Sequence, residues 1–396
     1  CMQYRAMGST GMEVSALGMG TMRLPLREGG QGDTSSRGAD VERSVELIRH
    51  AIDSGITYFD TAFNYLHGES EKIIGKALQD GYRERALIAT KSPIWMIEGE
   101  DDFDRLLRKQ LDRLQTDYID VYLLHSVMEK DWRNRVLPHR VVESLLAAKE
   151  AGLVKHIGFS FHDGPELLDE VLTAHPEFEF VQLQLNYLDW ESAGVQSRKC
   201  YEVAEKHGVP VFVMEPVKGG TLANVPEEVT KLFKDYNPEA SVPSWAIRFA
   251  ASLPNVKIVL SGMSDMDQLL DNTSYMQDFK PLNDEEKALI KKATDIINAS
   301  IDIPCTGCSY CTDGCPMQIA IPKYFSLYNA DMQELRGRGI SPDEGWTPQS
   351  EYYENVAKHF GKASACIQCG QCEGVCPQHL PIIEYLQTVA KHFERE

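Results

Sequence analysis

Short apolar runs rich in β-branched residues alternate with longer amphipathic stretches from residue 40 to about residue 275. This alternation indicates βαβ units and a parallel sheet. The stretches 41–55 and 103–114 carry apolar residues at helical spacing, and several stretches end on a glycine such as Gly55 or Gly152. The predicted strands are the runs 17–20, 57–59, 86–90, 118–124, 155–159, 180–185, 209–214 and 256–260.

Eight such units predict an α/β fold of the TIM (β/α)8 barrel type, which usually takes about 250 residues. A doubly wound open sheet is the alternative, but no G-x-G-x-x-G motif follows an early strand. The segment 27–42 follows the first strand and is rich in glycine and serine. Because active sites lie at the C-terminal ends of barrel strands, we expect a lid in this segment.

The chain changes character after the last predicted strand. Residues 283–300 predict a helix with Asn283 at its N-cap and Glu286 three residues later, a capping box. Beyond this helix the composition shifts to cysteine, proline and aromatic residues, and the stretch 336–350 has the composition of a loop. The helix therefore marks a predicted domain junction.

Eight of the ten cysteines lie in two copies of the pattern C-x-x-C-x-x-C-x-x-x-C-P. The pattern resembles the bacterial ferredoxin signature for two [4Fe–4S] clusters, in which the last cysteine of each run binds the other cluster. The resemblance implies two ligand sets: Cys305, Cys308, Cys311 and Cys376, and then Cys366, Cys369, Cys372 and Cys315. We expect a barrel over residues 1–282 and a small helical, ferredoxin-like iron–sulfur domain over residues 283–396.

Structural zinc is the alternative reading of these cysteines. Zinc sites usually present two ligand pairs, whereas each run here places four cysteines at one spacing before a proline. Disulfides are disfavoured further, because we expect a reducing compartment. Cys1 and Cys200 lie outside both runs.

The composition is that of an ordinary globular protein, with 43% hydrophobic and 25% charged residues in 396. The formal charge of −19 disfavours binding to nucleic acids and to anionic membranes. No window approaches the roughly 18 apolar residues of a membrane span, and the first residues lack a signal-peptide pattern. We expect a cytoplasmic protein, where thiolate-bound clusters are protected from oxidation.

Three consecutive predicted strands end on ionisable residues. Asp60, Lys91 and His125 close the second, third and fourth strands, and Tyr65 follows Asp60 in the next loop. Taken singly, such residues are more often structural: a histidine at a strand end is usually a packing residue, and Asp60 or Lys91 could be half of an ordinary ion pair. Together at the catalytic end of a barrel they indicate an active site.

These residues resemble the aldo-keto reductases. DTAFNY at 60–65, ATK at 89–91 and DVYLLH at 120–125 are similar to three motifs of that family. The resemblance covers roughly residues 3–275, and with the cysteine runs it points to the subgroup that carries a C-terminal ferredoxin-like domain. It implies a catalytic tetrad of Asp60, Tyr65, Lys91 and His125.

The chemistry of the tetrad follows from its side chains. A carbonyl that receives a hydride becomes an alkoxide and needs a proton. Tyr65 would supply that proton, and the Lys91 ammonium would favour the phenolate left behind. Asp60 would hold the lysine, and His125 would donate a hydrogen bond to the substrate oxygen.

The resemblance also implies contacts to NADP or NAD, with several departures. Ser160-Phe161 replaces a usual Ser-Asn pair, and Met214 replaces a stacking tyrosine, although core packing explains Met214 equally well. Relatives hold the 2′-phosphate with Lys-Ser and an arginine, and Gly262, Met263 and Gln268 stand there in this chain. The nucleotide set implied by resemblance is Gly20, Thr21, Ser160, Gln182, Met214, Pro216, Gly219, Gly262, Ser264, Gln268 and Asn272.

The sequence thus favours an NAD(P)H-dependent oxidoreductase that reduces a small-molecule carbonyl, or a related group, while two clusters relay electrons to a one-electron redox partner. A hydride carries two electrons and each cluster one, so coupling needs an intermediary; a flavin is conceivable, but no motif supports it. One alternative is a plain aldo-keto reductase with structural clusters. Another is an electron-transfer protein whose barrel is a docking platform. Substrate and oligomeric state are not indicated; Trp95, Trp132 and Tyr187 either line an apolar pocket or pack in the core.

Overall fold

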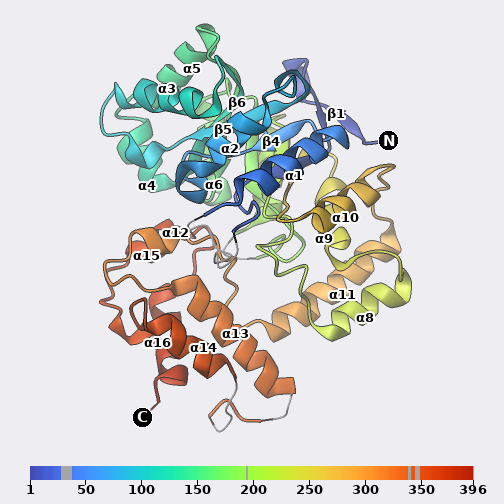
Figure 1. Cartoon of the computed structure of the whole chain (residues 1–396), viewed down its shortest axis with the longest axis vertical. Helices are drawn as coiled ribbons and strands as arrows, with labels where there is room; N and C mark the ends of the chain where they lie inside the picture. Colours follow the sequence, from blue (N-terminus) through green and yellow to red (C-terminus); the bar gives the residue numbers. More distant parts are fainter. Residues whose placement is uncertain (28–37, 193–194, 338–339, 344–347, 396) are drawn as a thin grey trace. The chain divides into compact units, whose positions relative to one another are not determined.

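The computed structural model describes residues 1–27, 38–192, 195–337, 340–343 and 348–395. The chain forms two compact units (Figure 1). The first contains Cys1–Val217 and Asn237–Ile290, and the second contains Lys218–Tyr236 and Lys291–Glu396. The boundary between residues 282 and 283 stays a prediction.

The first unit is a closed barrel of eight parallel strands, so the predicted TIM barrel is confirmed. Each of the eight predicted runs falls on one strand, and neighbouring strands pair in the order β10-β3-β4-β5-β6-β7-β8-β9. The strands are β3 (Leu17–Gly20), β4 (Tyr58–Asp60), β5 (Leu87–Ser92), β6 (Ile119–Val127), β7 (Val154–Phe161), β8 (Phe180–Gln184), β9 (Val211–Met214) and β10 (Val256–Gly262).

Alternation along each strand divides the barrel into an inner and an outer layer. On β6, Val121 and Leu123 belong to the inner cluster of side chains, whereas Tyr122 and Leu124 face the surrounding helices. The inner cluster is centred on the stacked rings of Phe180 and Phe212, whose centroids are 4.2 Å apart. The barrel interior is therefore a packed core, as in other TIM barrels.

A short antiparallel hairpin, which the sequence pattern did not predict, precedes the barrel. Its strands β1 (Tyr4–Ala6) and β2 (Glu13–Ser15) pair Tyr4 with Ser15. Val14 and Met7 are fully buried in the same cluster as the inner barrel side chains. The hairpin thus supplies apolar groups to the barrel interior, but its three-residue strands are too short to show an alternating pattern.

Amphipathic helices cover the outside of the barrel, with α1 and α2 next to each other in Figure 1. Helix α1 buries Leu47, Ile48 and Ala51 on one face, and Asp40 caps it by accepting a hydrogen bond from the Arg43 N–H. The helices of this unit are α1 (Val41–Asp53), α2 (Glu69–Ala77), α3 (Asp102–Leu114), α4 (Glu129–Asp131), α5 (Val141–Glu150), α6 (Pro165–Ala174), α7 (Ser197–Lys206), α9 (Val242–Ala251) and α10 (Met266–Met276).

The second unit is helical and has its own core. Tyr353 stacks on Phe393 with ring centroids 4.8 Å apart and contacts Tyr324, while Ile382 and Val389 pack in the same cluster. Its helices are α8 (Glu227–Tyr236), the C-terminal part of α11 (Asp284–Ser300), α12 (Tyr310–Asp313), α13 (Ile321–Gly337), α14 (Pro348–Ala357), α15 (Gln371–Val375) and α16 (Ile382–Phe393).

The predicted capping box at the start of α11 is confirmed. The Asn283 N–H donates to Glu286 Oε1 at 3.1 Å, and the Glu286 N–H donates to Asn283 Oδ1 at 2.8 Å. Arg248 adds an ion pair to Glu286 at 2.7 Å. This end of the helix is fixed within the first unit, and the division at residue 290 falls inside α11.

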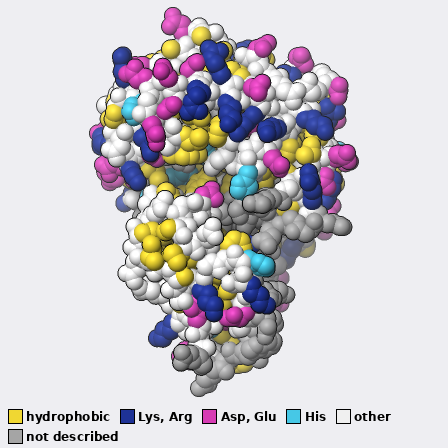
Figure 2. Space-filling model, turned by 60° about the vertical axis from the view of Figure 1, so that its left-hand side comes forward, with side chains coloured by type: hydrophobic (Ala, Val, Ile, Leu, Met, Phe, Trp, Pro, Cys, Tyr) yellow, Lys and Arg dark blue, Asp and Glu magenta, His cyan; other side chains and the backbone are white. Residues whose placement is uncertain are grey.

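Other predictions concern loops and the surface. Most of the predicted lid at 27–42 lies outside the described residues, as does much of the loop 336–350. At the base of the former, the Arg27 N–H donates to the Gly38 carbonyl at 2.9 Å. Figure 2 shows acidic and basic side chains interspersed over the visible face. No helix in the described ranges is both long and apolar enough to cross a membrane.

Candidate active site and cluster cavities

The ends of β4, β5 and β6 bring three ionisable residues to one end of the barrel. Asp60, Lys91 and His125 are 4%, 1% and 2% exposed, and Tyr65 from the short helix η2 (Tyr65–Gly68) is 8% exposed. The pairing of β4 with β5 and of β5 with β6 places the three strand ends in sequence around the barrel. The structure thus buries all four residues of the expected tetrad.

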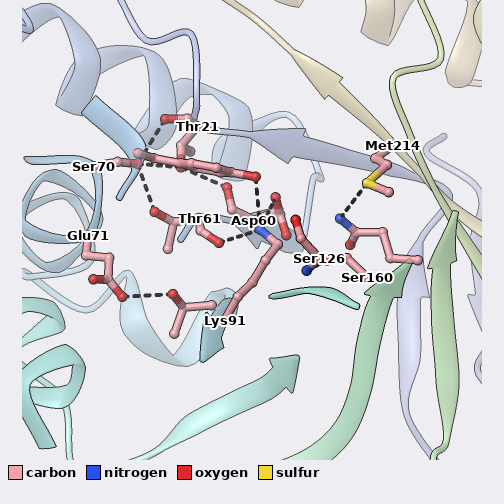
Figure 3. Close-up of polar contacts among 12 residues, drawn as sticks. Thr21, Asp60, Thr61, Ser70, Glu71, Lys91, Ser126, Ser160 and Met214 are labelled. Atoms are coloured by element: carbon pink, nitrogen blue, oxygen red, sulfur yellow. Dashed lines mark hydrogen bonds and ion pairs between the residues drawn. The ribbon is translucent and has the colours of Figure 1, made fainter. Parts of the chain in front are cut away.

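Lys91 is the centre of the hydrogen-bond network in Figure 3. Its Nζ donates to Asp60 Oδ2 at 2.9 Å and to the Thr61 carbonyl at 2.6 Å, and lies 3.2 Å from the Tyr65 hydroxyl. The same ammonium is 4.6 Å from the centre of the Tyr65 ring. A cation at this distance stabilises a phenolate relative to a phenol.

Burial governs the charges in this network. It lowers the pKa of Lys91, against the opposing effect of Asp60, and it raises the pKa of Asp60, against the opposing effect of Lys91. Burial, reinforced by the Lys91 charge, holds the pKa of His125 well below its ordinary value. His125 is therefore a neutral imidazole near pH 7, able to donate one hydrogen bond from a ring N–H.

Two buried residues that the sequence analysis did not single out hold the lysine strand. Gln110 donates from Nε2 to the Lys91 carbonyl at 2.7 Å and to Glu71 Oε2 at 3.0 Å. Glu71 is fully buried, forms an ion pair with Arg113 at 3.0 Å and accepts a hydrogen bond from the Thr90 hydroxyl at 2.8 Å. Helices α2 and α3 thereby fix the backbone on which Lys91 projects.

Of the three aromatic residues considered for an apolar pocket, Trp95 is next to the tetrad. Its ring centre lies 5.0 Å from that of His125. Trp132 is 2% exposed and packs edge-on against His175, and Tyr187 is 3% exposed and packs against Phe249. These contacts make Trp132 and Tyr187 packing residues, whereas Trp95 remains a candidate for contact with substrate.

The residues expected near the nicotinamide lie on, or directly after, strands β3, β7, β8 and β9. The Thr21 hydroxyl donates to the Asp60 carbonyl at 2.7 Å and contacts the Ser70 hydroxyl at 2.8 Å. The Ser160 hydroxyl accepts from the Ser126 N–H at 2.7 Å. Gln182 Nε2 lies 3.6 Å from the sulfur of half-buried Met214, a contact drawn in Figure 3.

The residues expected near the adenosine form a small network of their own at β10 and α10. Gln268 Oε1 accepts from the Ser264 N–H at 2.7 Å, and Asn272 Oδ1 accepts from the Tyr275 hydroxyl at 2.9 Å. The Ser264 hydroxyl donates to the Arg23 carbonyl at 2.6 Å, and the Arg23 side chain lies against Gly262. Arg23 thus brings a cation to this segment from 241 positions away, which explains why the sequence pattern did not reveal it.

Pro216 and Gly219 lie on different sides of the division between the units. Pro216 is buried and belongs to the first unit, whereas Gly219 belongs to the second. Gly219 has φ +62°, and a Cβ atom there would lie 1.9 Å from the Thr306 carbonyl oxygen, so only glycine fits. Its backbone packs on the first cysteine run, and a nucleotide contact for Gly219 stays a prediction.

The eight motif cysteines line two cavities in the second unit, and none of them forms a disulfide in the described part of the chain. The first cavity, of about 310 Å³ including space open to solvent, is lined by Cys305, Cys308, Cys311 and Cys376. The second cavity, of about 320 Å³, is lined by Cys315, Cys366, Cys369 and Cys372. These are the two sets of four that the ferredoxin resemblance implies.

The two cysteine runs have matching backbone conformations. The Gly307 N–H donates to Cys305 Sγ and the Gln368 N–H to Cys366 Sγ, each at 3.4 Å. Left-handed residues occur at the same offsets from the first cysteine of each run: Gly307, Ser309 and Gln318 in one, and Gln368, Gly370 and His379 in the other. Successive backbone N–H groups in such turns favour anionic ligands, including Fe–S clusters.

The donor set fits iron–sulfur clusters. Four sulfurs surround each cavity, and in the described ranges no three His, Cys, Asp or Glu residues form a site that could hold a metal ion. Burial raises the pKa of Cys311 and Cys376, and that of Cys372 to about 11, so these thiols need a bound cation to ionise near neutral pH. The cavities suit a cluster with several irons better than one zinc ion.

Comparisons with known proteins agree with a barrel followed by an iron–sulfur domain. Residues 16–295 match the family model "Aldo/keto reductase family", and residues 304–380 match the "4Fe-4S dicluster domain". "Aldo-keto reductase YhdN" of Bacillus subtilis is 35% identical over 168 residues, which are 40% of this chain and 47% of the relative. The chain thus spans about half the length of that curated relative.

Two solved structures show the same barrel. The holo form of aldo-keto reductase AKR11C1 from Bacillus halodurans is 26% identical with a TM-score of 0.61, and the match covers 74% of this chain and 96% of that chain. An aldo-keto reductase from Klebsiella pneumoniae in complex with NADPH is 20% identical with a TM-score of 0.60, over 74% of this chain and 95% of that one. At the latter identity the likeness concerns the fold alone.

Proposed function

Because the chain belongs to the aldo/keto reductase family, we propose that its barrel reduces a carbonyl, or a related group, on a small molecule with NADPH or NADH as the hydride donor. The observation that carries this proposal is the contact of Lys91 with both Asp60 and Tyr65 at 2.9 and 3.2 Å. An ordinary structural ion pair has no need of a tyrosine hydroxyl at its cation.

The tetrad residues would act in distinct ways. When bound, the nicotinamide supplies a hydride, and iron–sulfur clusters exchange single electrons. His125, neutral because its pKa is lowered, donates a hydrogen bond to the substrate oxygen and orients it. Tyr65 transfers its phenolic proton to that oxygen as the carbon is reduced, and takes a proton back from solvent.

Lys91 and Asp60 support the proton transfer without touching the substrate. The Lys91 ammonium stabilises the phenolate that Tyr65 becomes, so the proton leaves more easily. Asp60 and the Thr61 carbonyl hold the ammonium in place, and Gln110 holds the backbone of Lys91. Trp95 packs against His125 and would reduce the access of water from that side.

Strand ends and the β10–α10 segment would bind the nucleotide. Gln182 and Ser160 face the nicotinamide end by resemblance, and half-buried Met214 would cover its ring. Gln182 Oε1 is buried and has no hydrogen-bond partner in the part of the chain that the structure describes, which suits a carboxamide ligand. Gly20, Thr21, Pro216, Gly219, Gly262, Ser264, Gln268 and Asn272 complete the proposed set.

We further assign the two cavities to two [4Fe–4S] clusters that relay electrons to or from a one-electron redox partner. The support is the grouping of the eight cysteines around two cavities, together with the dicluster family match. A cytoplasmic location suits such thiolate ligands, which oxidation would destroy. Purely structural clusters are the competing proposal, and no flavin motif resolves the mismatch between two-electron and one-electron chemistry.

Anaerobic mixing of the holoprotein with NADPH or NADH tests both parts. Nicotinamide absorbance reports hydride transfer, and the visible absorbance of the clusters reports their reduction. Nicotinamide oxidation that requires an added carbonyl supports the barrel chemistry. Cluster bleaching during turnover supports the relay, whereas clusters that stay oxidised with every carbonyl and one-electron acceptor tried would leave them structural.

A further inference from the structure

Lys218 is a buried cation beside the first cavity. It follows β9 along the chain, belongs to the second unit and is 3% exposed. Its backbone is left-handed with φ +52°, and the next two residues, Gly219 and Gly220, are left-handed too. A lysine in this conformation costs conformational free energy compared with glycine.

Lys218 is hydrogen-bonded to a side chain on the wall of the first cavity. Its Nζ donates to Gln378 Oε1 at 3.3 Å. Gln378 is 6% exposed, follows Cys376 by two residues and lines the cavity of Cys305, Cys308, Cys311 and Cys376.

The lysine fixes the orientation of the Gln378 amide. An ammonium offers only donors, so the amide oxygen must face it and the NH₂ group must point elsewhere. In the described ranges Gln378 Nε2 is buried and has no acceptor. A buried donor without an acceptor is costly, and a sulfur ligand or sulfide in the adjoining cavity would satisfy it.

The second cavity lacks this arrangement. The position equivalent to Gln378, two residues after the last cysteine of the run, is Met317, which lines the second cavity. The other side chains there are mainly apolar, including Ile319, Ile367 and Leu386. Gln371 also lines the second cavity, so the two cavities share a backbone framework and differ in the glutamine that a buried lysine orients.

We propose that Lys218 and Gln378 raise the reduction potential of the cluster in the first cavity. Reduction adds one electron, supplied in a titration by dithionite, and so adds one negative charge to an already anionic cluster. An N–H donor to sulfur and a buried cation behind it both stabilise the more negative state. Gln378 makes the contact, and Lys218 orients it and adds its charge. The inference rests on the proposed assignment of two clusters.

The test is an anaerobic redox titration followed by electron paramagnetic resonance on the full-length holoprotein and its variants. Gln378→Met places in the first cavity the side chain that the second cavity already carries at that position. Lys218→Met removes the cation, and Lys218→Arg retains it. Lys231→Met is the matched control, since Lys231 lies in the same segment but is exposed and paired with Asp235.

Signals are assigned to cavities with Cys308→Ser and Cys369→Ser, which each disturb one cluster. In Gln378→Met and Lys218→Met we expect the reduced-to-oxidised ratio of the first cluster to fall at least tenfold at a fixed potential. A tenfold fall corresponds to a reduction potential lower by about 59 mV. In the same two variants, the reduced-to-oxidised ratio of the second cluster should stay within twofold of the wild type. In Lys218→Arg and Lys231→Met, the ratios of both clusters should stay within twofold of the wild type.

Three results would overturn the inference. The first is an unchanged reduction potential of the first cluster in iron-replete Gln378→Met. The second is an equal shift in the potentials of both clusters. The third is a fall in the potential of the first cluster in Lys218→Arg as large as that in Lys218→Met. Wild-type protein without two clusters would instead contradict the proposed function, so the two failures are distinguishable.

Discussion

Lys91 and Asp60 form an ion pair at 2.9 Å in which the two side chains are only 1% and 5% exposed. Either charge alone at this depth would be strongly unfavourable, so each depends on the other. The carboxylate oxygen that does not meet the lysine, Asp60 Oδ1, has no hydrogen-bond partner in the described part of the chain. The pair is thus held together through one carboxylate oxygen, while the other is buried without a partner among the described residues.

Replacing Tyr65 by phenylalanine should lower carbonyl reduction by about 100-fold or more, the scale of lost general-acid catalysis. The ring and its contact with Lys91 persist, so binding of NADPH or NADH should not change. Steady-state rates and fluorescence titration of the nucleotide measure the two effects. Tyr82→Phe is the control, because the Tyr82 hydroxyl contacts Asp53 on the surface. Full activity of Tyr65→Phe would refute the assignment of the tetrad.

Asp60→Asn should destabilise the barrel by about 3–5 kcal/mol, the cost of leaving a buried charge without its partner. Urea unfolding followed by tryptophan fluorescence measures this, since Trp95, Trp132, Trp190 and Trp245 all lie in the first unit. Asp53→Asn breaks a half-exposed pair with Arg85 and should cost at most about 1 kcal/mol. Equal losses of unfolding free energy in Asp60→Asn and Asp53→Asn would show that the buried pair stabilises the barrel no more than the exposed pair does.

His125 should make the barrel less stable in acid. Its pKa is lowered in the folded state, so between the folded and unfolded pKa values the unfolded chain binds a proton that the folded chain rejects. Stability is intact above pH 6.5 and falls as the pH drops below it. Below pH 6.5 the loss from this one group grows by up to about 1.4 kcal/mol per pH unit, until the folded imidazole is itself protonated. Other groups also titrate, so the measured quantity is the difference between wild type and His125→Gln, whose own acid loss should be smaller by that amount.

The nucleotide preference should be weak. Gly262, Met263 and Gln268 carry no charge for a 2′-phosphate, and Arg23 is the cation found against this segment. NADH should therefore bind within about tenfold of NADPH, a gap of about 1.4 kcal/mol. Arg23→Met should reduce the difference in binding free energy between NADPH and NADH. Arg43→Met, a substitution of an exposed residue on α1, should leave that difference unchanged. A thousand-fold preference for NADPH in isothermal titration would contradict this expectation.

Anaerobically purified protein should contain eight irons and eight acid-labile sulfides, because each cavity presents four thiols. Cys369→Ser should disturb the cluster of the second cavity and depress electron transfer to an external acceptor without preventing nicotinamide binding. Cys200→Ser is the control, since that buried cysteine lies outside both runs. Iron-free, zinc-loaded protein from iron-replete cells would rule out the assignment.

The sequence predicted those features that depend on residues close together in the chain. The eight strands could be predicted because each is a continuous apolar run bounded by amphipathic helices. The cysteine pattern could be recognised because its spacing is local. The tetrad residues Asp60, Lys91 and His125 could be grouped because parallel strands end at one face.

What the sequence concealed depends on long-range contact or on ordinary-looking residues. From the sequence, Glu71 and Gln110 resemble solvent-exposed residues of amphipathic helices, yet both are fully buried. Arg23 reaches Gly262 from the other end of the barrel sequence, and Lys218 meets Gln378 across 160 positions. Gly219 lies against the Thr306 carbonyl across 87 positions, while its contact with a nucleotide stays a prediction. Each of these relations is set by tertiary packing that no local pattern encodes.

The exchange of cysteines between the two runs has a consequence for the order in which the protein is made. The first cavity holds three thiols from the first run, but its fourth, Cys376, is synthesised 65 residues after Cys311. The second cavity likewise waits for Cys366, Cys369 and Cys372, although Cys315 is made much earlier. Neither cavity can have all four of its ligands until the second run has been synthesised, which follows all the residues of the barrel unit. Cluster assembly in the second unit therefore follows synthesis of the barrel unit, and a chain that stops before Cys376 lacks the complete first cavity.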